Sequence, residues 1–207
     1  MSAQPQAPAP DNNDVTLPDF SGQGFLPWLQ WVNYRLARVE QILAGLFVGL
    51  VFLLLILNIS TRAFGNALYW VDEAAVTAMV WMAFLAASVS LYARANIAVT
   101  LLTDAVPAGV ARVLAVVVDL VLLAFVLALA WMLWHWFAPM DLYSVGFDTD
   151  ALAAEFFNFI YQEPTQTLGI SKFWLWLVLP LFALGSLVHA LSNLDISLAR
   201  LLRAKEA

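Results

Sequence analysis

Three residues in a short stretch of the chain, residues 58–74 (NISTRAFGNALYWVDEA), have charged side chains that could form ion pairs at the ends of two helices. Arg62 closes one apolar run, and Trp70, Asp72 and Glu73 open the next. Positive charge suits the last turn of a helix, and negative charge suits the first turn. We therefore expect Arg62 to bond one acid and hold the two helices as a hairpin. The alternative is three charges in water, worth less than ~1 kcal/mol per pair.

One further acid, Asp119, lies inside a long apolar run (VARVLAVVVDLVLLAF). It follows Arg112 by seven residues, which is about 10 Å along a helix. A carboxylate at this depth in a membrane costs at least ~2.5 kcal/mol unless it is paired or hydrated. Two interpretations stay open. Asp119 carries protons in a small transporter that acts as a homodimer, or it lies shallower on a tilted helix or pairs across a subunit interface.

The sequence offers few candidate residues for redox chemistry, metal binding or nucleotide binding. The chain has no cysteine, and its two histidines are His135 and His189. They fall at opposite ends of two different apolar runs, so they cannot share one haem iron, and we interpret both as interfacial side chains with a polar edge in water. We find no Walker loop, no dinucleotide fingerprint and no HExxH motif. The sequence predicts neither an enzyme nor a bound cofactor.

The composition points to lipid as the solvent of this chain. Of its 207 residues, 63% are hydrophobic and 12% are charged, whereas soluble domains are about 45–50% apolar and about 25% charged. Four runs reach the ~20 apolar residues that a membrane helix needs. The sequence therefore predicts an all-α integral membrane protein. Within a domain of residues 42–195, its four transmembrane helices cover about 42–62, 71–93, 110–138 and 172–194.

The distribution of basic residues predicts the orientation of these helices, because Lys and Arg favour cytoplasmic loops. They gather before the first span, between the second and third spans, and after the fourth. We expect both termini to be cytoplasmic, with a basic tail over residues 196–207 and an acidic outer loop over residues 139–171. The net charge of −6 argues against a nucleic-acid partner. The residues counted as inner are Arg35, Arg38, Arg94, Arg112, Arg200, Arg203 and Lys205, and those counted as outer are Arg62 and Lys172.

The segments outside the spans differ in character. Residues 1–24 are polar and rich in proline, which predicts disorder. Residues 25–41 place Pro27 at a plausible first helical position and carry an apolar stripe. This predicts an amphipathic helix lying in the inner membrane interface, although the same residues could simply extend the first span. In the outer loop, ALAAEFFNFI at 151–160 predicts a short amphipathic helix.

Small residues suggest where helices associate. Gly45 and Gly49 form a GxxxG spacing in the first span, which allows another helix to approach closely, either within the chain or from a partner. Apart from Asp119, the spans lack the midplane ionisable groups that line a transport path. The residues therefore favour an accessory membrane subunit that contacts lipid and a partner.

The order of these features resembles the small membrane subunit, the Q-type component, of the tripartite ATP-independent periplasmic (TRAP) transporters. That family tends to show an arginine closing the first span, then Trp and an acidic pair opening the second, as Arg62, Trp70, Asp72 and Glu73 do here. After the second span the family often has a His and an Asp, where this chain has Asn96 and Thr100 instead. The outer loop is also longer than is usual for the family. The resemblance covers roughly residues 35–195.

The resemblance implies a function and partners. A periplasmic solute-binding protein captures an organic acid, and a large membrane subunit carries the solute together with sodium ions, so sodium is expected on that subunit and not on this chain. The small subunit braces the large one and helps to dock the binding protein. The resemblance also implies a location in the bacterial inner membrane, with the outer loop in the periplasm. The second acid of the pair Asp72 and Glu73 would then face a partner.

Overall fold

The computed structural model describes residues 24–94 and 106–206 of the chain and shows a helical protein. Its long helices are α1 (Pro27–Ala63), α2 (Tyr69–Tyr92), α4 (Ala108–Phe137) and α8 (Val178–Glu206). Three short helices lie between α4 and α8, namely α5 (Pro139–Ser144), α6 (Thr149–Phe156) and α7 (Phe173–Trp176). In the described part, β-structure is limited to an isolated antiparallel bridge between Pro164 and Ser171.

The long helices confirm the prediction of an all-helical chain with four candidate spans. In the described residues, four helices are long and apolar enough to cross a membrane. Their helical conformation pairs the backbone N–H and C=O groups within each helix, as the hydrocarbon of a bilayer requires. Local signals set their ends: Pro27 stands in the first turn of α1, and Gly65 takes a φ of +74° in the turn between α1 and α2.

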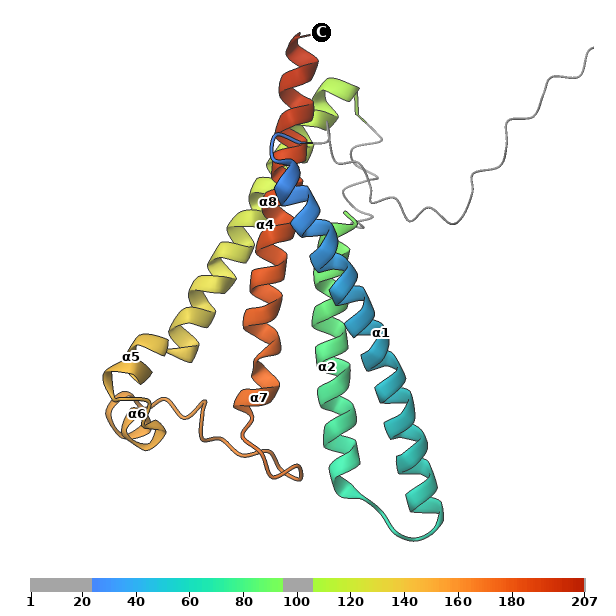
Figure 1. The fold of residues 1–207 in the computed structure, drawn as a ribbon, viewed down its shortest axis with the longest axis vertical. Coiled ribbons are helices and arrows are strands. Elements are labelled where there is room, and N and C mark those ends of the chain that lie inside the picture. Colours follow the sequence, from blue (N-terminus) through green and yellow to red (C-terminus); the bar gives the residue numbers. More distant parts are fainter. Residues whose placement is uncertain (1–23, 95–105, 207) are drawn as a thin grey trace, which may run out of the picture.

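The helices form two pairs that meet at α8. Helix α1 packs along α2, α4 packs along α8, and α8 also contacts α2 and α1. In Figure 1, α4 leans away from α8 toward α5, while α1 and α2 run side by side to their hairpin. Helix α8 contacts all three other long helices. As a result, 39% of the residues in the most apolar stretch of its span are buried, against 6–17% in the other three spans.

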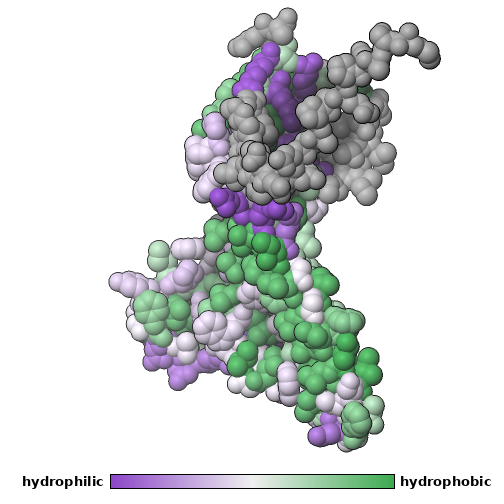
Figure 2. Space-filling model, turned by 45° about the vertical axis from the view of Figure 1, so that its right-hand side comes forward, coloured by the Kyte–Doolittle hydropathy of each residue, from purple (hydrophilic) through white to green (hydrophobic). Residues whose placement is uncertain are grey.

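Most of the remaining apolar surface is exposed, as expected for helices surrounded by lipid. Large exposed hydrophobic side chains occur along α1, α2 and α4, including Leu46, Phe52, Val121 and Phe125. Figure 2 shows hydrophobic residues over the broad middle of the molecule and hydrophilic residues gathered toward its ends. This distribution matches a bilayer, which is apolar in the middle and polar at both faces.

The segment expected as a separate interfacial helix, residues 25–41, has no break at its C-terminal end. Its residues from Pro27 onward form the first part of the continuous helix α1. A buried face explains the continuity, since Leu29, Gln30, Asn33, Ala37 and Glu40 are buried there at helical spacing. The expected tail over residues 196–207 likewise continues α8 to Glu206. The prediction for the N-terminus falls on residues 1–23, which lie outside the described part.

The outer loop folds back onto the ends of α4 and α8. Leu133 and Phe137 of α4 form a buried cluster with Ile160 of the loop and Ala183 of α8. The short helix expected at 151–160 is α6, which begins after Asp148, whose carboxylate accepts hydrogen bonds from the backbone N–H groups of Asp150 and Ala151. It ends earlier than expected, because Phe157 takes a φ of +54°.

Candidate functional site

The three charges of the α1–α2 hairpin form a bonded group at its tip. Arg62 Nη2 lies 2.7 Å from Asp72 Oδ2, and Arg62 Nε donates to Asn58 Oδ1 at 2.7 Å. Asn58 in turn donates from Nδ2 to Asp72 Oδ1. Arg62 and Asp72 are each about half exposed. The arginine thus bonds one acid of the pair, and Asn58, which the sequence reasoning had not assigned a role, bridges the two.

The second acid, Glu73, binds the outer loop of its own chain. Its Oε1 accepts from the backbone N–H of Gln166 at 2.9 Å. Its Oε2 accepts from the N–H and Oγ1 of Thr167 at 2.6 and 2.7 Å and from the N–H of Leu168 at 3.1 Å. The sequence predicts that the second acid faces a partner protein; in the structure its carboxylate organises the turn that precedes α7.

Replacing Glu73 with alanine is expected to loosen this turn. The backbone N–H groups at positions 166–168 lose their common acceptor, so their hydrogen exchange should accelerate, as measured by exchange mass spectrometry on the detergent-solubilised protein. Glu155→Ala is the matched control, because Glu155 is an exposed acid of the same loop. Unchanged exchange at 166–168 in Glu73→Ala would show that the carboxylate does not hold the turn.

The other residues singled out on α1 and α2 remain open to their surroundings. Trp70 is 41% exposed, at the level where Trp favours the headgroups. A Cβ added at Gly45 or Gly49 would meet nothing within 4 Å. The GxxxG face of α1 therefore does not pack on another of the helices that the structure describes.

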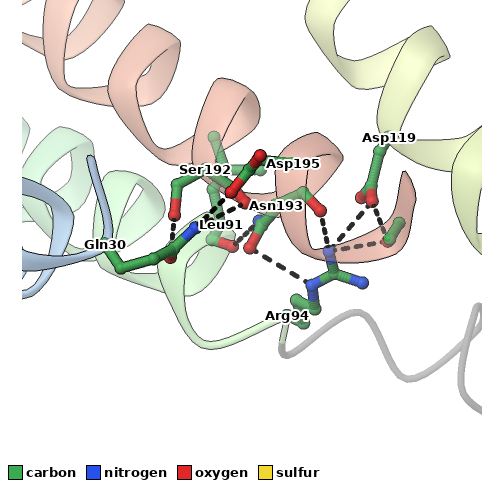
Figure 3. Close-up of polar contacts among 8 residues, drawn as sticks. Gln30, Leu91, Arg94, Asp119, Ser192, Asn193 and Asp195 are labelled. Atoms are coloured by element: carbon green, nitrogen blue, oxygen red, sulfur yellow. Dashed lines mark hydrogen bonds and ion pairs between the residues drawn. The ribbon is translucent and has the colours of Figure 1, made fainter. Parts of the chain in front are cut away.

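A second polar assembly lies at the opposite end of the helices, where Asp119 pairs with Arg94 (Figure 3). Arg94 Nη2 lies 2.9 Å from Asp119 Oδ2 and donates to Ser197 Oγ at 2.9 Å. Ser197 donates to the same Asp119 oxygen, and Arg94 Nε donates to Asn193 Oδ1 at 3.2 Å. The pairing within the chain explains how α4 can bury an acid. Asp119 is therefore not the lone carboxylate on which the homodimeric transporter considered above depends.

The backbone at Arg94 aims this side chain between α8 and α4. Arg94 has a φ of +50°, a conformation that is uncommon for residues other than glycine. Burial lowers the pKa of Arg94, the nearby Asp119 raises it, and the nearby positive charge of Arg200 lowers it further. The guanidinium of Arg94 therefore lies near both the carboxylate of Asp119 and the guanidinium of Arg200.

A third group of polar residues is buried between α1, α2 and α8. His189 is fully buried: its Nδ1 contacts Asn33 Oδ1, and its Nε2 lies 2.9 Å from Glu40 Oε2. Glu40 Oε1 accepts from Ser88 Oγ at 2.8 Å. The interpretation of His189 as an interfacial residue with its edge in water is thus wrong, because α1 and α8 enclose it. His135 is exposed at the far end of α4, with its Nδ1 2.8 Å from Trp131 O.

Gly185 is part of this third group because it leaves room for Glu40. A Cβ at Gly185 would lie 2.4 Å from Glu40 Oε1 and 3.0 Å from Ser88 Oγ. Close by, Ser186 Oγ is buried without a hydrogen-bond partner among the described residues. Glycine thus permits the approach of α8 to α1 at the level of the buried acid.

The start of α1 is also tied to α8. Asp195 accepts from the backbone N–H groups of Phe25 and Leu26, the two residues that precede α1. Gln30 Nε2 donates to Asp195 Oδ2 at 3.1 Å, and Ser192 Oγ donates to Gln30 Oε1 at 2.6 Å. The side chain of Asp195 therefore ties the segment before α1 and the first turn of α1 to α8.

One signal in the sequence could have identified these buried residues. The stretch SLVHALSNLDIS carries Ser186, His189, Asn193 and Ser197 at intervals of three or four residues, which is the spacing of one helix face. A polar face on an apolar helix indicates polar partners on neighbouring helices. The acids that meet this face, Glu40 and Asp119, come from α1 and α4.

The chemistry available to these groups is hydrogen bonding and ion pairing between helices. The described residues include no cluster of three or more His, Cys, Asp or Glu side chains that could hold a metal ion. Of the buried acids, Asp119 is paired with Arg94 and Glu40 with His189, while Asp195 accepts hydrogen bonds from backbone N–H groups and from Gln30. The arrangement therefore joins helices and does not expose a nucleophile or a general base to a substrate.

Comparison with known families agrees with this interpretation. A family model described as the DctQ component of tripartite ATP-independent periplasmic transporters matches residues 51–200. That range contains α2, α4 and the whole outer loop, together with most of α8 and the outer part of α1. No curated protein and no solved structure matches the chain.

Proposed function

Because this chain belongs to the DctQ family of TRAP transporter components, we propose that it braces the large membrane subunit and helps to dock the periplasmic solute-binding protein, with no solute path of its own. It is a multi-pass membrane protein and a transport component rather than an enzyme. Membership of the family implies partnership with the other TRAP components. The proposal concerns how this chain serves them.

The pairing of Asp119 with Arg94 is the observation that carries the bracing role. A solute or proton path needs ionisable groups that can change partners near the midplane. Here the buried carboxylates of Asp119 and Glu40 are held by Arg94, Ser197, Ser88 and His189. These groups hold helices together, which favours a rigid support. The open GxxxG face of α1 offers one apolar surface for a helix of the large subunit.

The transported solute and the coupling ion belong to the other subunits in this proposal. The family resemblance points to an organic acid captured by the periplasmic protein and to sodium ions bound by the large subunit. The distribution of Lys and Arg supports cytoplasmic termini in the bacterial inner membrane. In that orientation the loop after α4 and the hairpin tip face the periplasm, where a soluble binding protein docks.

Purification of the tagged chain in mild detergent tests the proposal. We expect a large multi-span membrane protein to be recovered in stoichiometric amount and identified by mass spectrometry. Reconstituted together with the binding protein, the two subunits should transport only when all three components and a sodium gradient are present. Recovery of the chain only as a homo-oligomer that transports alone, with transport lost in Asp119→Asn, would overturn the proposal.

The hairpin contact between Arg62 and Asp72 makes a prediction of its own. Because both groups are about half exposed, Arg62→Ala should lower the free energy of unfolding by less than about 1 kcal/mol. It should nevertheless lower the transport rate of the complete system, because the ends of α1 and α2 are no longer held in one geometry. The measurement is uptake by proteoliposomes, with Arg112→Ala as a control for charge. Normal assembly and uptake in Arg62→Ala would count against a role for this contact.

A further inference from the structure

A polar pocket of about 250 Å³ opens at the end of the helices that carries the C-terminus. It is formed by the first part of α1, by the end of α2 with Ala93 and Arg94 directly after it, and by the last part of α8. Its lining contains no carboxylate and includes two arginines. The polar residues that line it are Gln30, Asn33, Tyr92, Arg94, Asn193 and Arg200.

The positive charge of this pocket is only partly neutralised. Asp119 pairs with Arg94 from the α4 side and is not among the residues that line the pocket. Arg200 is exposed and forms no ion pair within residues 24–94 and 106–206. The two guanidinium groups are close enough for the charge of Arg200 to lower the pKa of Arg94. An anion between them would relieve this repulsion.

Hydrogen-bond donors from three parts of the chain are also available at the pocket. Arg94 uses Nε and Nη2 for its contacts with α8 and α4, which leaves Nη1 without a hydrogen bond in the described part of the chain. Asn33 is 96% buried, uses Oδ1 toward His189 and makes no described hydrogen bond through Nδ2. Arg200 adds a full guanidinium fork. Phosphate oxygens match such a set of donors, because arginine binds them through paired N–H groups.

We propose that this pocket binds a phosphate group and that the headgroup of an anionic phospholipid supplies it. Tyr92 is the last residue of α2, so the pocket lies where a membrane helix reaches the headgroup level. Basic pockets between membrane helices on the cytoplasmic side bind phosphorylated headgroups. Arg94 would contact the phosphate through Nη1, and Arg200 would close over it from α8. Soluble phosphate shares this chemistry and is the other source that the experiment distinguishes.

The test measures lipid binding by the full-length protein in a neutral detergent. The melting temperature is followed while phosphatidylglycerol, phosphatidylcholine or inorganic phosphate is added. We expect saturable stabilisation by phosphatidylglycerol and none by phosphatidylcholine. Arg200→Gln should weaken the apparent affinity about fivefold, the effect of one basic residue near an anionic headgroup. The control is Arg112→Gln, which removes the same charge from α4 outside the pocket and should leave the affinity unchanged.

Each outcome decides for or against the pocket. Stabilisation by inorganic phosphate at millimolar concentration, weakened by Arg200→Gln, would retain the phosphate site and assign it to a soluble ligand. Equal stabilisation by both lipids would overturn the proposal, as would equal effects of Arg200→Gln and Arg112→Gln. Because the readout needs neither a partner subunit nor transport, its failure would leave the bracing role of the chain untouched.

Discussion

Replacing Arg94 with alanine is expected to lower the free energy of unfolding by about 3 kcal/mol, because it leaves the carboxylate of Asp119 buried without its cation. The side chain of Asp119 is 5% exposed and that of Arg94 is 34% exposed. We therefore take the lower end of the 3–5 kcal/mol that is typical when one partner of a buried pair is removed. The measurement is denaturant-induced unfolding of the protein in detergent micelles.

Two variants make this prediction specific. Arg112→Ala removes an arginine whose Nε donates only to a carbonyl of its own helix, so the free energy of unfolding should change by less than about 0.5 kcal/mol. The double variant Arg94→Ala/Asp119→Ala removes both charges and should recover part of the stability lost in Arg94→Ala alone. Equal losses in Arg94→Ala and Arg112→Ala would show that Arg94 does not support the buried acid.

Replacing His189 with leucine is the second change with a large expected effect, also about 3 kcal/mol. The imidazole is fully buried and contacts both Asn33 and Glu40. Without it, Asn33 Oδ1 and Glu40 Oε2 lose their partners, and each unsatisfied buried polar group costs about 1–3 kcal/mol, more when it is charged. The expected result is a lower midpoint of unfolding in detergent.

The chain offers a matched control in its other histidine. His135 is exposed on α4, so His135→Leu should change the free energy of unfolding by less than about 0.5 kcal/mol. Adding Glu40→Gln to His189→Leu should recover part of the stability, because a neutral amide is less costly to bury unpaired than a carboxylate. Identical unfolding midpoints for His135→Leu and His189→Leu would contradict the role assigned to His189.

The two ends of the molecule differ in how tightly their charges are held. At the hairpin tip, Arg62 and Asp72 are about half exposed, so water screens their interaction. At the other end, Glu40, Asp119 and His189 are enclosed by helices, where an unpaired charge is far more costly. We therefore expect the buried assemblies around α8 to set stability and the hairpin tip to influence docking.

The helices themselves could be predicted from the residues alone, because the length and apolar character of a run are local properties. Each of the four runs is long enough to cross a bilayer, and a helix satisfies its own backbone there. The bond between Arg62 and one of the two acids could also be anticipated, since the charges flank a short turn. The partners of Glu73, Asp119 and His189 could not, because they lie 25 to 156 positions away in the chain.

Only the folded arrangement of α1, α2, α4 and α8 decides what each polar side chain in a span contacts. A histidine near the end of an apolar run has the same sequence context whether it faces headgroups or a neighbouring helix. Whether His189 faces headgroups or a helix depends on α1. This helix begins before the expected start of the span and places Asn33 and Glu40 against α8. Burial of a polar group is a property of the neighbours that enclose it, and those neighbours come from distant parts of the chain.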